Sequence, residues 1–212
     1  MREFTIDRDY HGVGCKIYKK SKIIIKPGLT VLVGCNGSGK TTLIQQLKDK
    51  LHQAKVDCLS FDNLRDGGSH LASKALFFND MSLAAGALMS SEGEKIALSI
   101  GEWAKEIGQY IRRHTENKEL WLFFDAVDSG LSVDNVLEVK DFFNLVFADN
   151  RGKRDVYIII SANEYELARE AECFAVHEGE YITFRNYEEY RNYIIKSRKA
   201  KDSRKYKQKG GD

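Results

Sequence analysis

One short stretch has the residue types and spacing needed to hold a chain of phosphates. It reads Gly-Cys-Asn-Gly-Ser-Gly-Lys-Thr-Thr from Gly34 to Thr42 and matches the pattern G-x-x-x-x-G-K-[ST]. Glycines in this pattern let successive backbone N–H groups converge on phosphate oxygens, and the following helix adds the positive end of its dipole. Lys40 would reach the β- and γ-phosphates, and Thr41 would bind magnesium. The sequence therefore predicts a site for ATP and Mg²⁺.

The loop has the local context that the motif requires. An apolar run at 29–33 precedes it, where a strand should deliver it, and the helical pattern of 41–48 follows it. Strand, loop and helix in this order favour a true phosphate site over a chance match. The loop residues expected to contact the nucleotide are Gly34, Asn36, Gly37, Ser38, Gly39, Lys40, Thr41 and Thr42.

A carboxylate ends a second apolar run further along the chain. Residues 120–125 read Leu-Trp-Leu-Phe-Phe-Asp, and such a continuous apolar run predicts a buried parallel strand. Because open α/β sheets bind ligands at the carboxyl ends of their strands, Asp125 would lie beside the phosphate loop. Asp125 would hold Mg²⁺ there through water.

A helix is predicted to begin within the segment Met89-Ser-Ser-Glu-Gly-Glu-Lys95. Ser90 or Ser91 can cap this helix, and Glu92 and Glu94 fall in its first turn, where acidic side chains are favourable. Apolar residues then recur at helical spacing at positions 96, 100, 103, 107 and 111.

These motifs occur in the order typical of the ABC superfamily. The loop resembles the G-x-N-G-S-G-K-T form of these ATPases, and Ser91, Gly93 and Glu94 match the S-x-G-[QE] core of their signature motif. Residues 120–125 resemble the Walker B strand, and Asp-Ser-Gly-Leu-Ser at 128–132 resembles the D-loop. The chain is most similar in style to the soluble chromosome-maintenance and repair ATPase heads.

The resemblance implies an α/β fold of the P-loop NTPase type. This fold has three layers and a small N-terminal antiparallel β-subdomain, for which we expect strands at 3–7 and 22–25. The short interval between Lys40 and Ser91 implies a reduced helical subdomain. The other predicted elements are strands at 54–61 and 156–161, a helix within 134–147, a helix over 164–172, and a hairpin of 173–177 and 181–184 with His177 on the surface beside its turn.

The resemblance also implies a site that two chains share. Ser91 and the amide of Gly93, in the same motif as Glu94, would contact the γ-phosphate of a nucleotide bound to the opposite subunit. The opposite subunit would be a second copy of the chain or a related ATPase. Tyr10 or His11 falls near the position from which an aromatic ring stacks on adenine.

Two residues depart from the family pattern. Ala126 stands where a glutamate usually positions the attacking water, and Asn163 stands where a histidine usually senses the γ-phosphate. Loss of a general base typically costs about 10² to 10⁴ in rate, so we expect tight ATP binding and weak ATPase activity. The catalytic candidates are Asp125, Asp128 and Asn163. Three explanations of Ala126 stay open: a divergent branch in which Asp128 or a partner's side chain orients water, an engineered trap, or a binding switch.

The composition fits one compact domain with a basic tail. The chain has 212 residues, of which 42% are hydrophobic and 30% charged, enough for a substantial core. Without a signal peptide or an apolar run of about 18 residues, we expect a cytoplasmic protein with no direct membrane insertion. Residues 1–195 are the expected ATP-binding domain. Residues 196–212, with eight basic and two acidic side chains, are an expected disordered tail suited to nucleic acid.

Together these features predict a soluble, slowly hydrolysing ATP-gated switch that dimerises, in nucleic-acid metabolism or as a sensor subunit. Two other functions stay open. The ATP-binding subunit of a membrane transporter would share the motifs, although the short interval after Lys40 leaves little room to grip membrane subunits. A P-loop kinase for a small metabolite would share only the loop.

Overall fold

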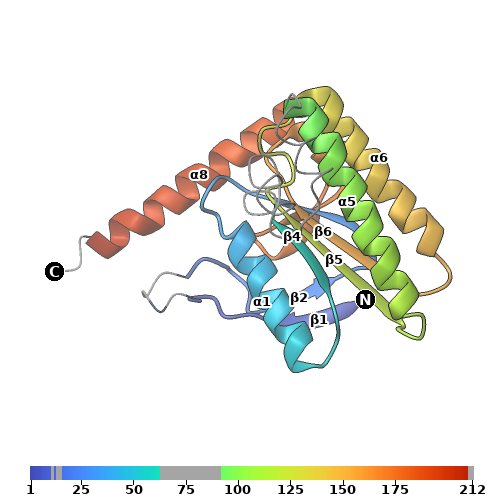
Figure 1. Ribbon diagram of the computed structural model, residues 1–212. Helices are drawn as coiled ribbons and strands as arrows, with labels where there is room; N and C mark the ends of the chain where they lie inside the picture. Colours follow the sequence, from blue (N-terminus) through green and yellow to red (C-terminus); the bar gives the residue numbers. More distant parts are fainter. Residues whose placement is uncertain (11, 13–15, 63–91, 210–212) are drawn as a thin grey trace.

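A six-stranded sheet runs through the middle of the chain (Figure 1). The computed structural model describes residues 1–10, 12, 16–62 and 92–209, and within these ranges it describes side chains outside 92–99 and 204–209. In spatial order the strands are β4 (Leu59–Asp62), β5 (Glu119–Asp125), β6 (Asp155–Ser161), β3 (Gly28–Val33), β7 (Glu172–Ala175) and β8 (Glu180–Ile182). All are parallel except β8, which pairs antiparallel with β7. Because β6 lies between β3 and β5, the carboxyl ends of these three strands meet at one edge.

Two further layers cover the faces of this sheet. One face packs against α1 (Lys40–Gln53) and a small antiparallel sheet of β1 (Arg2–Thr5) and β2 (Lys22–Ile25). The other face packs against α5 (Glu92–Arg113), α6 (Val133–Asn150) and the short α7 (Tyr165–Ala168). The predicted three-layer α/β fold of a P-loop NTPase, with N-terminal antiparallel strands, is therefore confirmed. The predicted reduced helical subdomain falls mainly on residues 63–91, which lie outside the described residues.

β5 shows why a continuous apolar run forms a central strand here. Trp121 and Phe123 belong to the buried cluster on the α1 side, where Trp121 stacks on Tyr157 with ring centroids 3.8 Å apart. Leu122 and Phe124 belong to the cluster beneath α5 and α6. Successive side chains of a strand point to opposite faces, so both faces must be apolar when both are covered.

The structure shortens the helix predicted over 164–172 to α7 (Tyr165–Ala168), and it also shortens the strand predicted at 54–61. β4 begins at Leu59, whereas the sequence predicted a strand over 54–61. α1 continues to Gln53, and Lys55 then turns the chain with a φ of 56°. The residues from 54 to 58 are used by this turn and by the approach to the sheet, although their pattern is apolar enough for a strand.

The C-terminal stretch also differs from the prediction of a disordered tail. Helix α8 runs from Tyr187 to Lys209, so position 196 lies inside a continuous helix that extends beyond the sheet layers (Figure 1). This stretch contains no glycine or proline and is rich in lysine and arginine, which favour helix. High charge suggested disorder, but it is equally compatible with an exposed helix. None of the helices in the described ranges is long and apolar enough to span a membrane.

Candidate nucleotide-binding site

The loop at 34–42 has a backbone shape that requires glycine. Gly37 and Gly39 have φ values of 73° and 99°, in the left-handed region that side chains disfavour. A Cβ on Gly39 would lie 2.6 Å from Cγ2 of Ile17, and a Cβ on Gly34 would lie 2.5 Å from Oγ of Ser38. Side chains at these positions would therefore disturb the loop. The loop connects β3 to α1, and Gly39 directly precedes Lys40, the first residue of α1.

Lys40 lies across this loop. Its Nζ donates hydrogen bonds of 2.9 Å to the carbonyl of Gly34 and to Oδ1 of Asn163. Burial lowers the pKa of Lys40, and the carboxylate of Asp128 opposes this shift. The ammonium therefore lies in a partly desolvated position, where it would interact strongly with an anion.

A cavity of about 570 Å³ opens over the loop. Its volume is within the range of about 300 to 1,000 Å³ that small-molecule sites occupy. The cavity is lined by Ile17, Asn36, Gly37, Gly39, Lys40, Thr41, Thr42, Asp125, Ala126, Asp128, Ser129, Ser161, Asn163 and Glu164. It therefore collects the loop after β3 and the residues that end β5 and β6, where open α/β sheets bind ligands.

Asp125 is fixed by the neighbouring strand. Its Oδ1 accepts hydrogen bonds from the hydroxyl of Ser161 and, at 3.1 Å, from the backbone N–H of Ala126. Ser161 ends β6, and the same hydroxyl accepts the Ala126 N–H at 2.8 Å. The sequence did not single out Ser161, because its role depends on the pairing of β5 with β6.

Ala126 brings only a methyl group to the cavity. Its φ is 52°, in the left-handed region that residues with a Cβ rarely adopt. The hydrogen bonds from its N–H to Asp125 and Ser161 hold this shape. Ala126 therefore forms part of the cavity wall. By resemblance this position would have a carboxylate that positions water, and here it has no carboxylate.

Asp128 is buried, with 6% of its surface exposed. Its Oδ2 accepts the backbone N–H groups of Asn163 and Glu164, the latter at 2.6 Å, at the start of α7. Its Oδ1 is buried without a hydrogen-bond partner among the described residues. Asp128 therefore joins the end of β5 to α7 and still has one acceptor oxygen without a partner there.

The other predicted contacts do not all reach this cavity. Tyr10 donates a hydrogen bond from its hydroxyl to Oδ2 of Asp49 at 3.2 Å and is not among the lining residues, whereas Ile17 is. His11, the alternative to Tyr10, and Ser91 lie outside the described residues. Gly93 and Glu94 are in the first turn of α5, which begins at Glu92, but their side-chain surroundings also lie outside that description.

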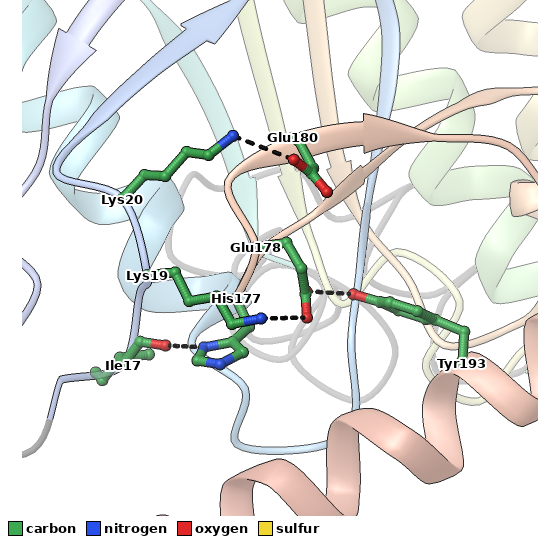
Figure 2. A network of polar contacts seen from close by, with 7 residues as sticks. All are labelled: Ile17, Lys19, Lys20, His177, Glu178, Glu180 and Tyr193. Carbon is green, nitrogen blue, oxygen red and sulfur yellow. Dashed lines mark hydrogen bonds and ion pairs between the residues drawn. The ribbon is translucent and has the colours of Figure 1, made fainter.

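His177 was predicted to be on the surface, and this is wrong. Only 9% of the residue is exposed, and its Nδ1 lies 2.6 Å from the carbonyl of Ile17. In Figure 2, Lys19 and Lys20 reach toward Glu178 and Glu180 around the β7–β8 turn, with N···O distances of 3.7 and 3.1 Å. These contacts hold the segment that carries Ile17 at the edge of the cavity.

The comparison with known families agrees with this geometry. The sequence model of the AAA domain family matches residues 25–169, which is more than half of the chain. The chain belongs to this family of P-loop ATPase domains. No curated protein sequence matches the chain. The match defines the class, while the ABC-type assignment stays a prediction.

Proposed function

We propose that the chain is an ABC-type ATP-binding domain that hydrolyses ATP slowly and works as an ATP-gated dimerising switch. One observation carries this proposal: Lys40, Asp125 and Asn163 line a single cavity whose wall has alanine at position 126. Such a cavity has the groups that bind a triphosphate and lacks the carboxylate that by resemblance would activate water.

Binding would use the loop and the ends of two strands. The backbone N–H groups from Gly37 to Thr42 and the ammonium of Lys40 would bind the phosphates. Asn163, which already accepts a hydrogen bond from Lys40, would donate its amide N–H to the terminal phosphate. ATP would therefore replace contacts that Lys40 makes within the chain.

The residues present also suit Mg²⁺. Thr41 and Asp125 line the same cavity, and Mg²⁺ is commonly bound by one or two protein oxygens together with substrate phosphates and water. Within the described ranges there is no cluster of three histidine, cysteine or acidic side chains that could hold a metal without a nucleotide. When bound, Mg²⁺ would neutralise charge on the phosphates.

Slow hydrolysis follows from the wall of the cavity. The methyl group of Ala126 cannot accept a proton, and Asp128 uses Oδ2 to bind the backbone of α7. The remaining oxygen, Oδ1, has no hydrogen-bond partner among the described residues, and Asp128 lines the cavity. Asp128 is therefore our candidate for the residual orientation of water.

Dimerisation and a polyanion partner complete the proposal. By resemblance, the segment of Ser91, Gly93 and Glu94 of a second copy, or of a related ATPase subunit, would close the site over the γ-phosphate. The basic residues from Lys196 to Lys209 would attract nucleic acid, because neutralising phosphates with lysine and arginine releases counterions.

Equilibrium binding and phosphate release test the nucleotide part directly. The wild-type chain should bind MgATP and release phosphate slowly. The variant Lys40→Ala should bind about 10- to 100-fold more weakly, because charge-assisted hydrogen bonds to phosphate are lost. Unchanged affinity in Lys40→Ala would refute the assignment of the cavity. Rapid phosphate release by the wild-type chain would refute slow hydrolysis.

A further inference from the structure

One face of α8 follows the phosphate-binding loop. Tyr190, Ile194, Ser197 and Lys201 are spaced by four, three and four residues, which places them on one side of a helix. The hydroxyl of Tyr190 donates to the carbonyl of Asn163, the residue that binds Lys40. The two later members of this row contact the loop itself.

Ser197 anchors the helix to the loop. Its Oγ accepts the backbone N–H of Cys35 at 3.2 Å, and Ser197 and Cys35 are only 7% and 3% exposed. A buried polar group that loses its partner costs free energy, so this contact fixes the register between α8 and the loop. The next residue of the row, one turn further along α8, is Lys201.

Lys201 lies against the peptide unit that joins Asn36 to Gly37. Its Nζ donates a 2.8 Å hydrogen bond to the carbonyl of Asn36, and a Cβ on Gly37 would lie 3.5 Å from the same Nζ. Asn36 and Gly37 both line the nucleotide cavity. The neighbouring carboxylate of Asp202 forms an ion pair with Arg198 at 3.5 Å, and no ion pair to Lys201 is found among the described residues.

We propose that Lys201 is a second phosphate-binding lysine, supplied by α8 of the same chain to the terminal phosphate of the nucleotide. This proposal rests on the proposed ATP site. Lys40 reaches the β- and γ-phosphates in this type of loop, and its partner Asn163 also contacts α8. The terminal phosphate would therefore lie on the side of the loop that faces the Tyr190–Lys201 row.

When ATP binds, Nζ of Lys201 would move from the carbonyl of Asn36 to the terminal phosphate. Lys201 has rotatable bonds that let Nζ leave a neutral carbonyl for a phosphate oxygen, which is the stronger acceptor. ADP lacks the terminal phosphate, so it offers Lys201 no equivalent partner. The contribution of Lys201 therefore depends on the third phosphate.

The test compares the affinities of a non-hydrolysable ATP analogue and of ADP by titration calorimetry. Lys201→Met should weaken binding of the ATP analogue by about tenfold or more and change ADP affinity less than about threefold. Lys201→Arg should recover most of the lost affinity. Arg191→Met, which removes one positive charge from an exposed position of the same helix, is the matched control and should bind both nucleotides normally.

Two outcomes would overturn this role for Lys201. One is an unchanged affinity of Lys201→Met for the ATP analogue. The other is an equal loss for both nucleotides together with a lower thermal midpoint in their absence, which would show a purely structural contact. The variant Lys40→Ala distinguishes failure of the Lys201 proposal from failure of the proposed ATP site. Unchanged nucleotide affinity in Lys40→Ala would refute the ATP site, whereas the two outcomes for Lys201→Met refute only the role of Lys201.

Discussion

Ala126 is the residue at which the chemistry of this site can be changed most directly. The backbone of Ala126 already has a positive φ, which is unfavourable for any residue with a Cβ. Replacing alanine with a larger residue therefore adds little further backbone strain. Ala126→Glu should raise turnover at saturating MgATP by at least about tenfold, because a carboxylate would then face the attacking water. Phosphate release measures this change.

Ala126→Gln is the control for that substitution, since it has the same length without a proton acceptor. Only the glutamate should accelerate hydrolysis. A rate that stays at the wild-type value in Ala126→Glu would mean that another step or another residue limits turnover.

Asp128 combines two roles that substitution can separate. Asp128→Ala removes the acceptor of two backbone N–H groups at the start of α7 and should destabilise the fold by about 1 to 3 kcal/mol. Asp128→Asn retains one acceptor oxygen, so it should unfold closer to wild type while lowering residual hydrolysis by about tenfold or more. Urea unfolding and phosphate release report the two effects. Normal hydrolysis in Asp128→Asn would assign Asp128 to structure alone.

The sequence predicted the site residues that belong to a recognisable motif. The loop, Asp125 and Asn163 were expected near one another, and the structure places Asp125, Asn163 and most of the loop around one cavity, whose lining does not include Gly34 or Ser38. Ser161 and Ile17 were not foreseen, because their positions depend on strand pairing and on the contact between His177 and the Ile17 carbonyl. Such long-range contacts have no local sequence signal.

Among the elements, α8 differs from the disordered tail that the sequence predicted. Its charge suggested disorder, yet the Tyr190–Lys201 row has helical spacing and contacts the loop. The spacing is visible in the sequence, whereas the loop residues that Ser197 and Lys201 contact lie more than 160 residues away. The strands were easier to predict, because continuous apolar runs such as the one in β5 have few alternatives.

The end of α8 gives a prediction about nucleic acid. Truncation after Ser203 removes four basic residues, Arg204, Lys205, Lys207 and Lys209, and leaves the row that contacts the loop. If these residues contact phosphates, the slope of log affinity against log salt should become shallower by about 2 to 3 for single-stranded DNA. Fluorescence anisotropy across a salt series measures the slope.

The matched control for this truncation removes only 210–212, which contain no basic residue. This shorter deletion should leave the slope close to that of the full chain. Equal slopes for the full chain and the longer truncation would exclude the end of α8 as the nucleic-acid contact.

Across the whole molecule, two covered faces of one sheet bury several tyrosines. Burial raises the pKa of Tyr110 and Tyr157 to about 12, above the ordinary value of 10.0. Because the folded state keeps these protons longer than the unfolded state, their contribution to stability is complete below pH 10 and is lost as the pH rises to 12. The free energy of unfolding should therefore fall over this interval.

Urea unfolding at successive pH values tests this fall. Tyr110→Phe removes one of the titrating groups, so its stability should decline less steeply between pH 10 and 12 than that of the wild-type chain. Parallel declines would show that Tyr110 does not contribute to the alkaline loss of stability.

The central claim is that ATP joins two copies of this domain, and the mass of the particle in solution tests it most directly. Light scattering coupled to size-exclusion chromatography should give a single chain of 24.2 kDa without nucleotide. With Mg²⁺ and a non-hydrolysable ATP analogue, it should give twice that mass for the wild-type chain and the single-chain mass for Lys40→Ala. A wild-type chain that binds the analogue and keeps the single-chain mass would contradict the claim.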